Sequence, residues 1–353
     1  MVSSSVELTV ALDAMGGDNA PLSVLKGADR ARKKYPNIKF LLYGNKNILS
    51  DLLASMPKLK ECSTICHSEN EISVNDKPSV ALRKGKNSSM RLAIDSVKSG
   101  KSSAVVSAGN TGALMAMAKL VLRTLPGIDR PAITSIFPTR KGRCVLLDLG
   151  ANIDCNSDNL VQFAIMGDAF AKVILDIPSP TIGLLNVGVE DIKGSEVVKS
   201  AAEELREGEY PLNFQGFVEG DDIAGGKTDV VVTDGFTGNV ALKTAEGTAK
   251  ICSDFVKQAF KGSPLAFLGG ILASRSLKKT FRKLDPRLHN GAMFLGLNGI
   301  AVKSHGGTDD IGFANAISVA VELAANNINE KITQELAVLE EVGIEDEYDE
   351  EQL

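Results

Sequence analysis

Short apolar runs alternate with longer amphipathic segments along this chain. Six runs are mostly aliphatic and are bounded by glycine, aspartate or asparagine. They lie at residues 6–12, 38–43, 104–106, 144–147, 182–185 and 230–232. Such runs are typical of strands that are buried on both faces of a parallel sheet.

The segments between these runs have the spacing of apolar residues that is typical of helices. They predict helices at 22–34, 88–98, 112–125, 159–175, 195–207, 239–261 and 311–327. The sequence shows no internal repeat, which argues against a solenoid. The alternation therefore predicts an α/β fold, an α/β/α sandwich around a mostly parallel sheet.

The length bounds the number of domains. At about 100–200 residues per domain, 353 residues fit two domains or one large α/β domain with an insertion. We expect one α/β domain over 1–339, in one or two lobes. The segment 340–353 has eight acidic residues and no basic one, which predicts a solvated, disordered tail.

Composition narrows the class of protein. The formal charge is −5, from 39 basic and 44 acidic residues, and this gives no support for binding nucleic acid. No apolar run reaches the roughly 18 residues of a membrane span. The start of the chain has no secretory pattern, and five scattered cysteines do not make a disulfide framework. We therefore expect a cytoplasmic protein.

Polar turns that contain glycine follow five of the predicted strands. They are DAMGGDNAP at 13–21, SAGNTG at 107–112, DLGANID at 148–154, NVGVEDIKG at 186–194 and TDGFTGN at 233–239. Ligands of parallel sheets bind beyond the carboxyl ends of the strands, and the N–H groups of a following helix favour anions such as phosphate. We expect these turns to share one rim and one small-ligand site. The alternative is that they are ordinary turn formers.

Several known motifs are absent. GKT at 226–228 resembles the end of a phosphate-binding loop, but Asp221 stands where that loop needs glycine, and a predicted strand follows. No GxGxxG follows the first strand, so an NAD site is unsupported. Cys62, Cys66 and His67 have no second Cys/His pair at metal-binding spacing. We expect no metal and no cofactor.

The segment 257–287 predicts a basic, apolar helical arm. It holds eight basic residues and one acidic one. Residues 264–272 are apolar and, we expect, flexible, and Leu277, Phe281 and Leu284 then form a helical stripe. Such an arm suits an anionic membrane surface or an acidic partner; the alternative is packing on the protein's own core or on a second subunit. Its contact residues would be Leu265, Phe267, Leu268, Ile271, Leu272, Leu277 and Phe281.

The segment ALDAMGGDNAP at 11–21 resembles the N-terminal signature of the bacterial phosphate acyltransferase family PlsX. Further matching segments carry the resemblance to about residue 307. They lie at 86–90, 107–114, 127–132, 147–154, 184–194 and 230–247. Two positions depart from the pattern of many members. Asn19 replaces histidine, which argues against an obligatory base there, and HNGA at 289–292 replaces YGGA.

The resemblance implies transfer of a long-chain fatty acyl group from acyl carrier protein to inorganic phosphate. The acyl phosphate would serve the first acylation of glycerol 3-phosphate in phospholipid synthesis. It also implies a homodimer with a fold related to phosphate acetyltransferases and isopropylmalate-type dehydrogenases. Peripheral contact with the membrane is implied too, with the membrane glycerol 3-phosphate acyltransferase as a further candidate partner.

This chemistry needs positioned charges rather than a protein nucleophile, because phosphate is nucleophilic and a thiolate leaves readily. We hypothesise that Lys193 or Lys243 offsets the phosphate charge, that Asn239 or Asn110 donates to the oxyanion, and that Asp234 orients the lysine or takes a proton. Structural ion pairs or turn roles are the alternatives for Lys193, Lys243 and Asp234. The remaining substrate-binding candidates are Asp13, Gly16, Gly17, Asp18, Asn19, Ser107, Gly109, Thr111, Asn152 and His305. For His305, a purely structural role is equally open.

Other functions compete with this hypothesis. A phosphate transacetylase that uses short-chain acyl-CoA would perform the same chemistry. An NAD-dependent hydroxy-acid dehydrogenase and a non-enzymatic membrane scaffold belong to other classes. The sequence does not decide the acyl chain length, the order of binding, the phosphate-binding lysine or what the arm contacts.

Overall fold

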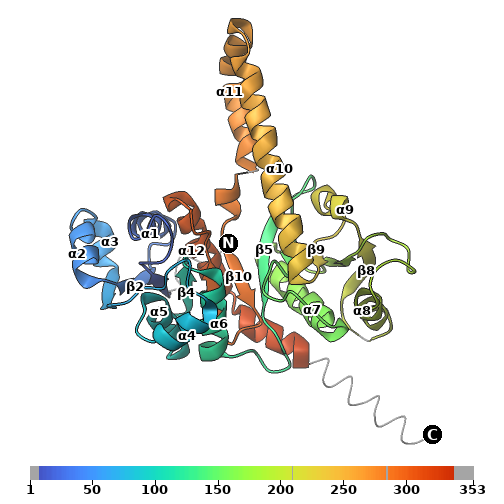
Figure 1. The fold of residues 1–353 in the computed structure, drawn as a ribbon, viewed down its shortest axis with the longest axis horizontal. Coiled ribbons are helices and arrows are strands. Elements are labelled where there is room, and N and C mark those ends of the chain that lie inside the picture. The colour runs from blue at the N-terminus through green and yellow to red at the C-terminus, as the bar shows by residue number, and fades with distance from the viewer. Residues whose placement is uncertain (1–7, 209, 284, 338–353) are drawn as a thin grey trace, which may run out of the picture.

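The computed structural model describes residues 8–208, 210–283 and 285–337. An 11-stranded sheet forms its centre, in the order β3-β2-β1-β4-β11-β10-β5-β6-β9-β7-β8 (Figure 1). The strands are β1 (Thr9–Asp13), β2 (Lys39–Gly44), β3 (Ser63–His67), β4 (Ala104–Ser107), β5 (Ala132–Pro138), β6 (Arg143–Leu147), β7 (Thr181–Leu185), β8 (Asn213–Val218), β9 (Val230–Val232), β10 (Ala292–Leu295) and β11 (Ile300–Lys303).

Helices connect the strands, and several begin at a polar N-cap. The helices are α1 (Leu22–Lys34), α2 (Lys46–Ala54), α3 (Pro57–Glu61), α4 (Pro78–Lys84), α5 (Ser89–Lys98), α6 (Thr111–Leu122), α7 (Ser157–Ile174), α8 (Glu196–Glu207), α9 (Gly220–Gly225), α10 (Gly235–Lys261), α11 (Pro264–Lys283), the 3-10 helix η1 (Pro286–His289) and α12 (Asp310–Ala325). A further helix covers Ile328–Ala337. Side chains that accept from backbone N–H groups of the first turn start α2, α5, α6, α8, α10 and α12.

The sheet has two parallel halves that run in opposite directions. Strands β3, β2, β1, β4 and β11 are parallel to one another, as are β6, β9, β7 and β8. Strand β10 is antiparallel to β11 and β5, and β5 is antiparallel to β6. The turns after β6, β7 and β9 therefore leave the sheet in the opposite direction from those after β1 and β4. The expectation that all five turns share one rim is wrong, because the β5–β6 hairpin reverses the strand direction.

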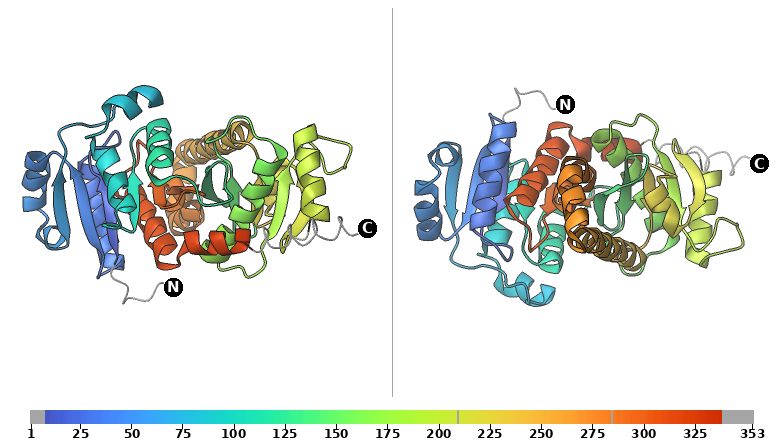
Figure 2. Two further views of the ribbon diagram at one scale, coloured as in Figure 1. Left: turned by 90° about the horizontal axis from the view of Figure 1, so that it is seen from below. Right: turned by 90° about the horizontal axis from the view of Figure 1, so that it is seen from above.

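Helices cover both faces of the sheet, as the α/β/α sandwich requires (Figure 2). Alternate strand residues separate into two buried clusters: Val10 and Leu12 pack on one face with α1, α7 and α12, and Ala11 packs on the other with α5 and α6. The prediction of a mostly parallel α/β fold is confirmed. The predicted strands and helices are all present, and α1 has the predicted bounds. The sequence analysis missed β3, β5, β8, β10 and β11.

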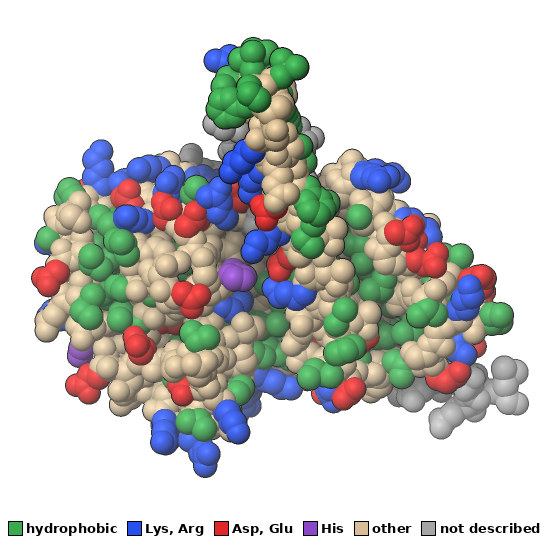
Figure 3. Space-filling view, turned by 45° about the horizontal axis from the view of Figure 1, so that its top comes forward, with side chains coloured by type: hydrophobic (Ala, Val, Ile, Leu, Met, Phe, Trp, Pro, Cys, Tyr) green, Lys and Arg blue, Asp and Glu red, His purple; other side chains and the backbone are tan. Residues whose placement is uncertain are grey.

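Helices α10 and α11 form a pair that projects from the body of the molecule (Figure 1). Helix α11 is continuous from Pro264, so the expectation of a flexible segment over 264–272 is wrong. The two helices approach closely, since a Cβ atom at Gly270 would lie 2.9 Å from the Phe260 ring. Apolar side chains gather at the tip of the pair and basic ones near its base (Figure 3). Leu265 and Leu272 are each 80% exposed.

Some predicted features fall outside the described residues. These are Leu284, the side chain of Phe281 and the acidic tail over 340–353. Within the described residues, no single helix is long and apolar enough to cross a bilayer, although the bent pair Asp310–Ala325 and Ile328–Ala337 meets the length and composition test when taken together.

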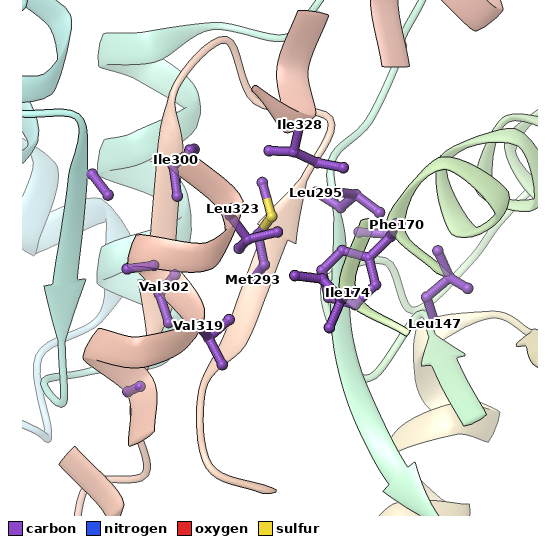
Figure 4. Packing of buried hydrophobic residues seen from close by; sticks show 14 of the residues in the cluster. Leu147, Phe170, Ile174, Met293, Leu295, Ile300, Val302, Val319, Leu323 and Ile328 are labelled. Atoms are coloured by element: carbon purple, nitrogen blue, oxygen red, sulfur yellow. The ribbon is translucent and has the colours of Figure 1, made fainter. Parts of the chain in front are cut away.

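The centre of the core lies under β10. Figure 4 shows Met293 and Leu295 between Leu323 of α12 and Phe170 of α7, and all four side chains are buried. Phe170 is 1% exposed, and removal of such a side chain costs about 3–5 kcal/mol of stability. This packing joins the two halves of the sheet, and so it fixes the turns of one half relative to those of the other.

Candidate functional site

The turn after β1 is built on the buried carboxylate of Asp13. Its two oxygens accept hydrogen bonds from the hydroxyl groups of Ser89 (2.6 Å) and Ser107 (2.7 Å). Burial raises the pKa of Asp13 above its ordinary value, although both hydroxyls favour the charged form. Asp13 is 1% exposed, and through these two hydrogen bonds it supports the turns after β1 and β4 from below.

The glycine pair Gly16–Gly17 allows two turns to approach closely. A Cβ atom at Gly16 would overlap the Asp13 carboxylate and lie 2.9 Å from the backbone nitrogen of Gly109. Gly17 has φ +105°, which disfavours other residues. The backbone of the β1–α1 turn therefore lies directly against the β4–α6 turn, as a shared anion site requires.

The β4–α6 turn uses most of its polar side-chain groups internally. The Gly109 N–H donates to the Ser107 hydroxyl (3.0 Å). Asn110 caps α6 by accepting from Ala113 N–H (2.9 Å), and its amide nitrogen donates to the carbonyl of Val74 (2.7 Å). The Asn110 side chain is thus committed to the fold and is poorly placed to donate to an oxyanion. The first turn of α6, which begins at Thr111, presents N–H groups that have no acceptor within the helix.

Asp18, Asn19 and His305 lie where the β1–α1 turn meets the loop after β11. The Asp18 N–H donates to the Gly306 carbonyl (3.0 Å), and the Asn19 amide donates to the Thr308 carbonyl (3.2 Å). The Nδ1 atom of His305 accepts from the Gly307 N–H (3.1 Å). These contacts give Asn19 and His305 structural partners within the loop.

Asn290, from the segment that departs from the PlsX pattern, also holds this loop. Its oxygen accepts from the His305 N–H (2.9 Å), and its nitrogen donates to the Ser304 hydroxyl and the Gly312 carbonyl, both at 2.8 Å. No motif in the sequence indicated this role of Asn290. The next residue, Gly291, has φ +120°, a backbone conformation that favours glycine.

Asp148 organises the turn after β6 and was also missed. It is fully buried and accepts from the N–H groups of Ile133 (2.8 Å) and Asn152 (2.7 Å). Burial raises the pKa of Asp148. The Asn152 amide donates to Asp148 and to the Pro131 carbonyl, each at 2.9 Å. The Asn152 side chain is 8% exposed and these bonds use both of its amide hydrogens, so they give it a structural role in this turn.

Helix α10 begins against this turn. The Gly235 N–H donates to the Asn152 carbonyl (2.7 Å). Asp234 caps the helix by accepting from the Thr237 N–H (2.8 Å) and hydroxyl (2.6 Å), and within the described residues it contacts neither candidate lysine. Asn239 is exposed and lies beside the turn, since a Cβ atom added at Gly150 would lie 3.6 Å from the Cβ atom of Asn239.

The two candidate lysines are exposed and paired with glutamates. Lys193 lies in the turn after β7, 2.9 Å from Glu190, and this hydrogen bond raises the pKa of Lys193. Lys243 lies one turn beyond Asn239 on α10, 2.7 Å from Glu246. A residue and its i+4 neighbour share a helix face, so Lys243 and Asn239 lie on one side of α10.

A cleft of about 350 Å³ lies between α6 and the turn after β6, with Ile133 between them. Its lining residues are Thr111, Gly112, Met115, Ala116, Lys119, Ile133, Gly150 and Ala151. The cleft is mostly apolar, it begins at the first turn of α6, and Asn239 lies beside Gly150 at its other side. Among the described residues, no cluster of three or more His, Cys, Asp or Glu side chains suits a metal ion.

Comparison with known proteins identifies relatives over nearly the full chain. A family model described as "Fatty acid synthesis protein" matches residues 8–331. A phosphate acyltransferase of Paramagnetospirillum magneticum is 55% identical over 331 residues, 94% of either chain. One of Rhodospirillum centenum is 57% identical over 336 residues, 95% of either chain.

Solved structures share the fold at low sequence identity. A phosphotransacetylase of Streptococcus pyogenes matches with a TM-score of 0.64 and 17% identity, over 90% of this chain and 94% of its own. A branched-chain phosphotransacylase of Enterococcus faecalis matches with a TM-score of 0.57 and 14% identity, over 90% and 99% of the two chains. These structures show the fold alone.

Proposed function

This chain belongs to the fatty acid synthesis protein family and is a phosphate acyltransferase, and we propose that its acyl donor is a long-chain acyl carrier protein. The observation that carries the activity is the identity of 55–57% with phosphate acyltransferases over 94–95% of either chain. The apolar cleft beside the candidate phosphate turns supports a donor with a long acyl chain.

In the proposed reaction a phosphate oxygen attacks the thioester carbonyl carbon. A C–O bond forms, the C–S bond breaks, and the thiolate of the carrier's prosthetic arm leaves and takes up a proton. No protein nucleophile is required, so the protein contributes position and stabilisation of charge. This assigns the chemistry to backbone N–H groups, an amide and a lysine.

Phosphate binds at the first turn of α6, against the Gly16–Gly17 turn. N–H groups at a helix start favour anions, and Thr111 and Gly112 line the cleft at this point. The Gly109 N–H is not part of the set, since it donates to Ser107. The first turn of α6 therefore replaces Gly109 as the anion-binding element.

Asn239 donates to the oxyanion that develops on the thioester carbonyl. We assign this role to Asn239 and not to Asn110, because the Asn110 amide donates hydrogen bonds to carbonyls of the 74–76 loop. The phosphate charge is assigned to Lys193 or Lys243, the two exposed lysines that follow β7 and β9, and Lys243 shares the α10 face with Asn239. Asp234 acts through its cap, which fixes the start of α10 and hence Asn239.

The acyl chain lies along the cleft, against Met115, Ala116 and Ile133. These side chains offer apolar contact over two turns of α6, beginning at the phosphate position. A short-chain acyl-CoA phosphate transacetylase is the alternative function. Its support is that the solved phosphotransacylases share the fold of this chain.

The α10–α11 pair is assigned to membrane contact. Its tip exposes Leu265, Phe267, Leu268, Ile271 and Leu272 at 54–80% of their surface. Lysine and arginine side chains near the base (Figure 3) would meet anionic lipid headgroups or the acidic carrier protein. We further propose a homodimer of α/β domains that binds the membrane surface peripherally and delivers acyl phosphate to a membrane acyltransferase.

The test is acyl phosphate formation by the purified protein with inorganic phosphate and three donors in parallel. These are long-chain acyl carrier protein, long-chain acyl-CoA and acetyl-CoA. The proposal expects the highest kcat/KM with the carrier-protein thioester. Activity with acetyl-CoA alone would support the transacetylase alternative and overturn the proposed donor.

A further inference from the structure

The ammonium group of Lys303, at the end of β11, lies beneath the β4–α6 turn. Its Nζ atom donates to the backbone carbonyls of Ala108 (3.0 Å), Gly109 (2.6 Å) and Ser304 (2.6 Å). An ammonium group has three donors and no acceptor, so each donor has a carbonyl partner. Lys303 therefore ties the β4–α6 turn to the loop that carries His305.

These hydrogen bonds fix the orientation of two consecutive peptide units. In a trans peptide the N–H points opposite to the C=O of the same unit. The Gly109 carbonyl points at Lys303, and the N–H of Asn110, in the same unit, therefore points away from it. Asn110 precedes the first turn of α6, where Thr111 lines the cleft. The contact thus turns the Asn110 N–H outward, beside the proposed phosphate position.

A second buried charge holds the same turn from the β1 side. Asp13 accepts from the Ser107 hydroxyl, and that hydroxyl in turn accepts from the Gly109 N–H. Lys303 instead binds the two carbonyls that follow Ser107. The turn is thus held between a carboxylate and an ammonium group, and neither group belongs to the set that would touch phosphate.

Burial lowers the pKa of Lys303 to about 8, although Asp13 from β1 and Asp18 from the β1–α1 turn both favour the charged form. Lys303 therefore carries its charge at neutral pH and loses it as the pH rises above about 8. By contrast, Glu190 raises the pKa of Lys193. The two lysines are thus distinguished by the pH at which each becomes neutral.

We propose that Lys303 is a positioning residue of the phosphate subsite: it orients the Ala108–Gly109 peptides so that the N–H groups at the start of α6 converge on phosphate, and it places a buried positive charge beneath the anion. This inference rests on the proposed function. It predicts a selective effect on phosphate, because the acyl chain and the thioester contact other residues.

The test compares Lys303→Met and Lys303→Arg with Lys34→Met, a control on α1 that removes a lysine paired with Glu322. Phosphate and acyl donor are varied separately. Lys303→Met is expected to raise the KM for phosphate about tenfold or more, the loss of one charge-assisted interaction, with the donor KM nearly unchanged. Lys303→Arg, which keeps the charge, recovers part of this loss. A wild-type phosphate KM in Lys303→Met, or an equal rise in both KM values, overturns the proposal.

The wild-type enzyme supplies a second test that needs no variant, should Lys303→Met fail to fold. The KM for phosphate is expected to rise between about pH 7.5 and about pH 9.5, as Lys303 loses its proton. Inorganic phosphate is already largely a dianion over this range. A phosphate KM that stays flat over this range overturns the inference. If the wild type forms no acyl phosphate, the proposed function fails; if it forms product but the phosphate KM responds to neither test, only the role of Lys303 fails.

Discussion

Gly238, in the first turn of α10, lies so close to the backbone of Asp148 that a Cβ atom at this position would overlap the Asp148 carbonyl oxygen. This contact seats the start of α10 on the turn after β6. A hydrogen bond from the Gly235 N–H to the Asn152 carbonyl (2.7 Å) reinforces it. The position of Asn239 beside the cleft is therefore set by the fit of two backbone segments.

Gly238→Ala is expected to displace the start of α10 and with it Asn239. A displacement of this kind lowers kcat by about a hundredfold when the displaced group acts in the transition state. The matched control is Gly247→Ala on the same helix, where a Cβ atom meets nothing within 4 Å. The control should keep full activity and gain about 0.5–1 kcal/mol of stability, from helix propensity. Thermal unfolding and acyl phosphate assays on both variants check this, and equal activities would contradict it.

Exchange of single lysines should identify the phosphate-binding cation. The backbone of Lys193 is held by the Asn186 amide, which donates to its carbonyl (2.9 Å), whereas Lys243 lies on an exposed helix face. We expect Lys193→Met to lower kcat/KM for phosphate at least about tenfold, as the loss of a charged hydrogen bond does, and Lys243→Met to have a smaller effect. Lys199→Met is the control, since Lys199 also forms an exposed i,i+3 pair, with Glu196. A larger loss in Lys243→Met would exchange the two roles.

A bulky side chain in the cleft should shorten the accepted acyl chain. Ala116→Phe adds a ring to the lining of the cleft, and it is expected to lower kcat/KM for long-chain donors about tenfold or more while short-chain donors lose little. Leu120→Phe adds bulk to an exposed position of α6 that does not line the cleft. A uniform loss over all chain lengths would mean that the acyl chain lies elsewhere.

Charged residues at the tip of the α10–α11 pair should weaken vesicle binding. The double variant Leu265→Glu, Leu272→Glu alters two side chains that are 80% exposed, so folding should be unaffected. Binding to vesicles that contain anionic lipid is expected to weaken at least about tenfold, since apolar insertion is lost and negative charge is added. Turnover of acyl carrier protein in solution should persist. Ile48→Glu, at an exposed position of α2, is the control; if it weakens binding equally, the tip is not the membrane contact.

The apolar pattern of the sequence predicted many elements, but not all of them. Helix α1 was placed at its observed bounds and the strand over 230–232 was placed correctly, whereas β10 (Ala292–Leu295), which is also wholly apolar, was missed. The reversal of the sheet was not predictable in this way. It depends on the antiparallel pairs that β10 forms with β11 and β5, and that β5 forms with β6. The pairing of β10 with β5 joins segments that are distant in sequence.

For the site, the sequence predicted the loops but not the roles of the individual side chains. Glycine-rich turns marked the correct loops, but the residue type alone did not tell which amides are free to bind a ligand. Asn110 and Asn152 read as ligand-binding residues, and the structure commits both to backbone carbonyls. Lys303 was missed because a lysine at the end of an apolar run is typical of the end of a strand and does not by itself indicate a site residue. Its role depends on carbonyls that lie 194 and 195 positions away in the chain.

The most direct test of the central claim is to follow the fate of 18O-labelled inorganic phosphate by 31P NMR, with long-chain acyl carrier protein as donor. Attack of phosphate on the thioester carbonyl leaves every P–O bond intact. We expect acyl phosphate that retains all the labelled oxygens, formed by the wild type and greatly reduced in Gly238→Ala. Free fatty acid without acyl phosphate, or product that has lost labelled oxygen, would contradict it.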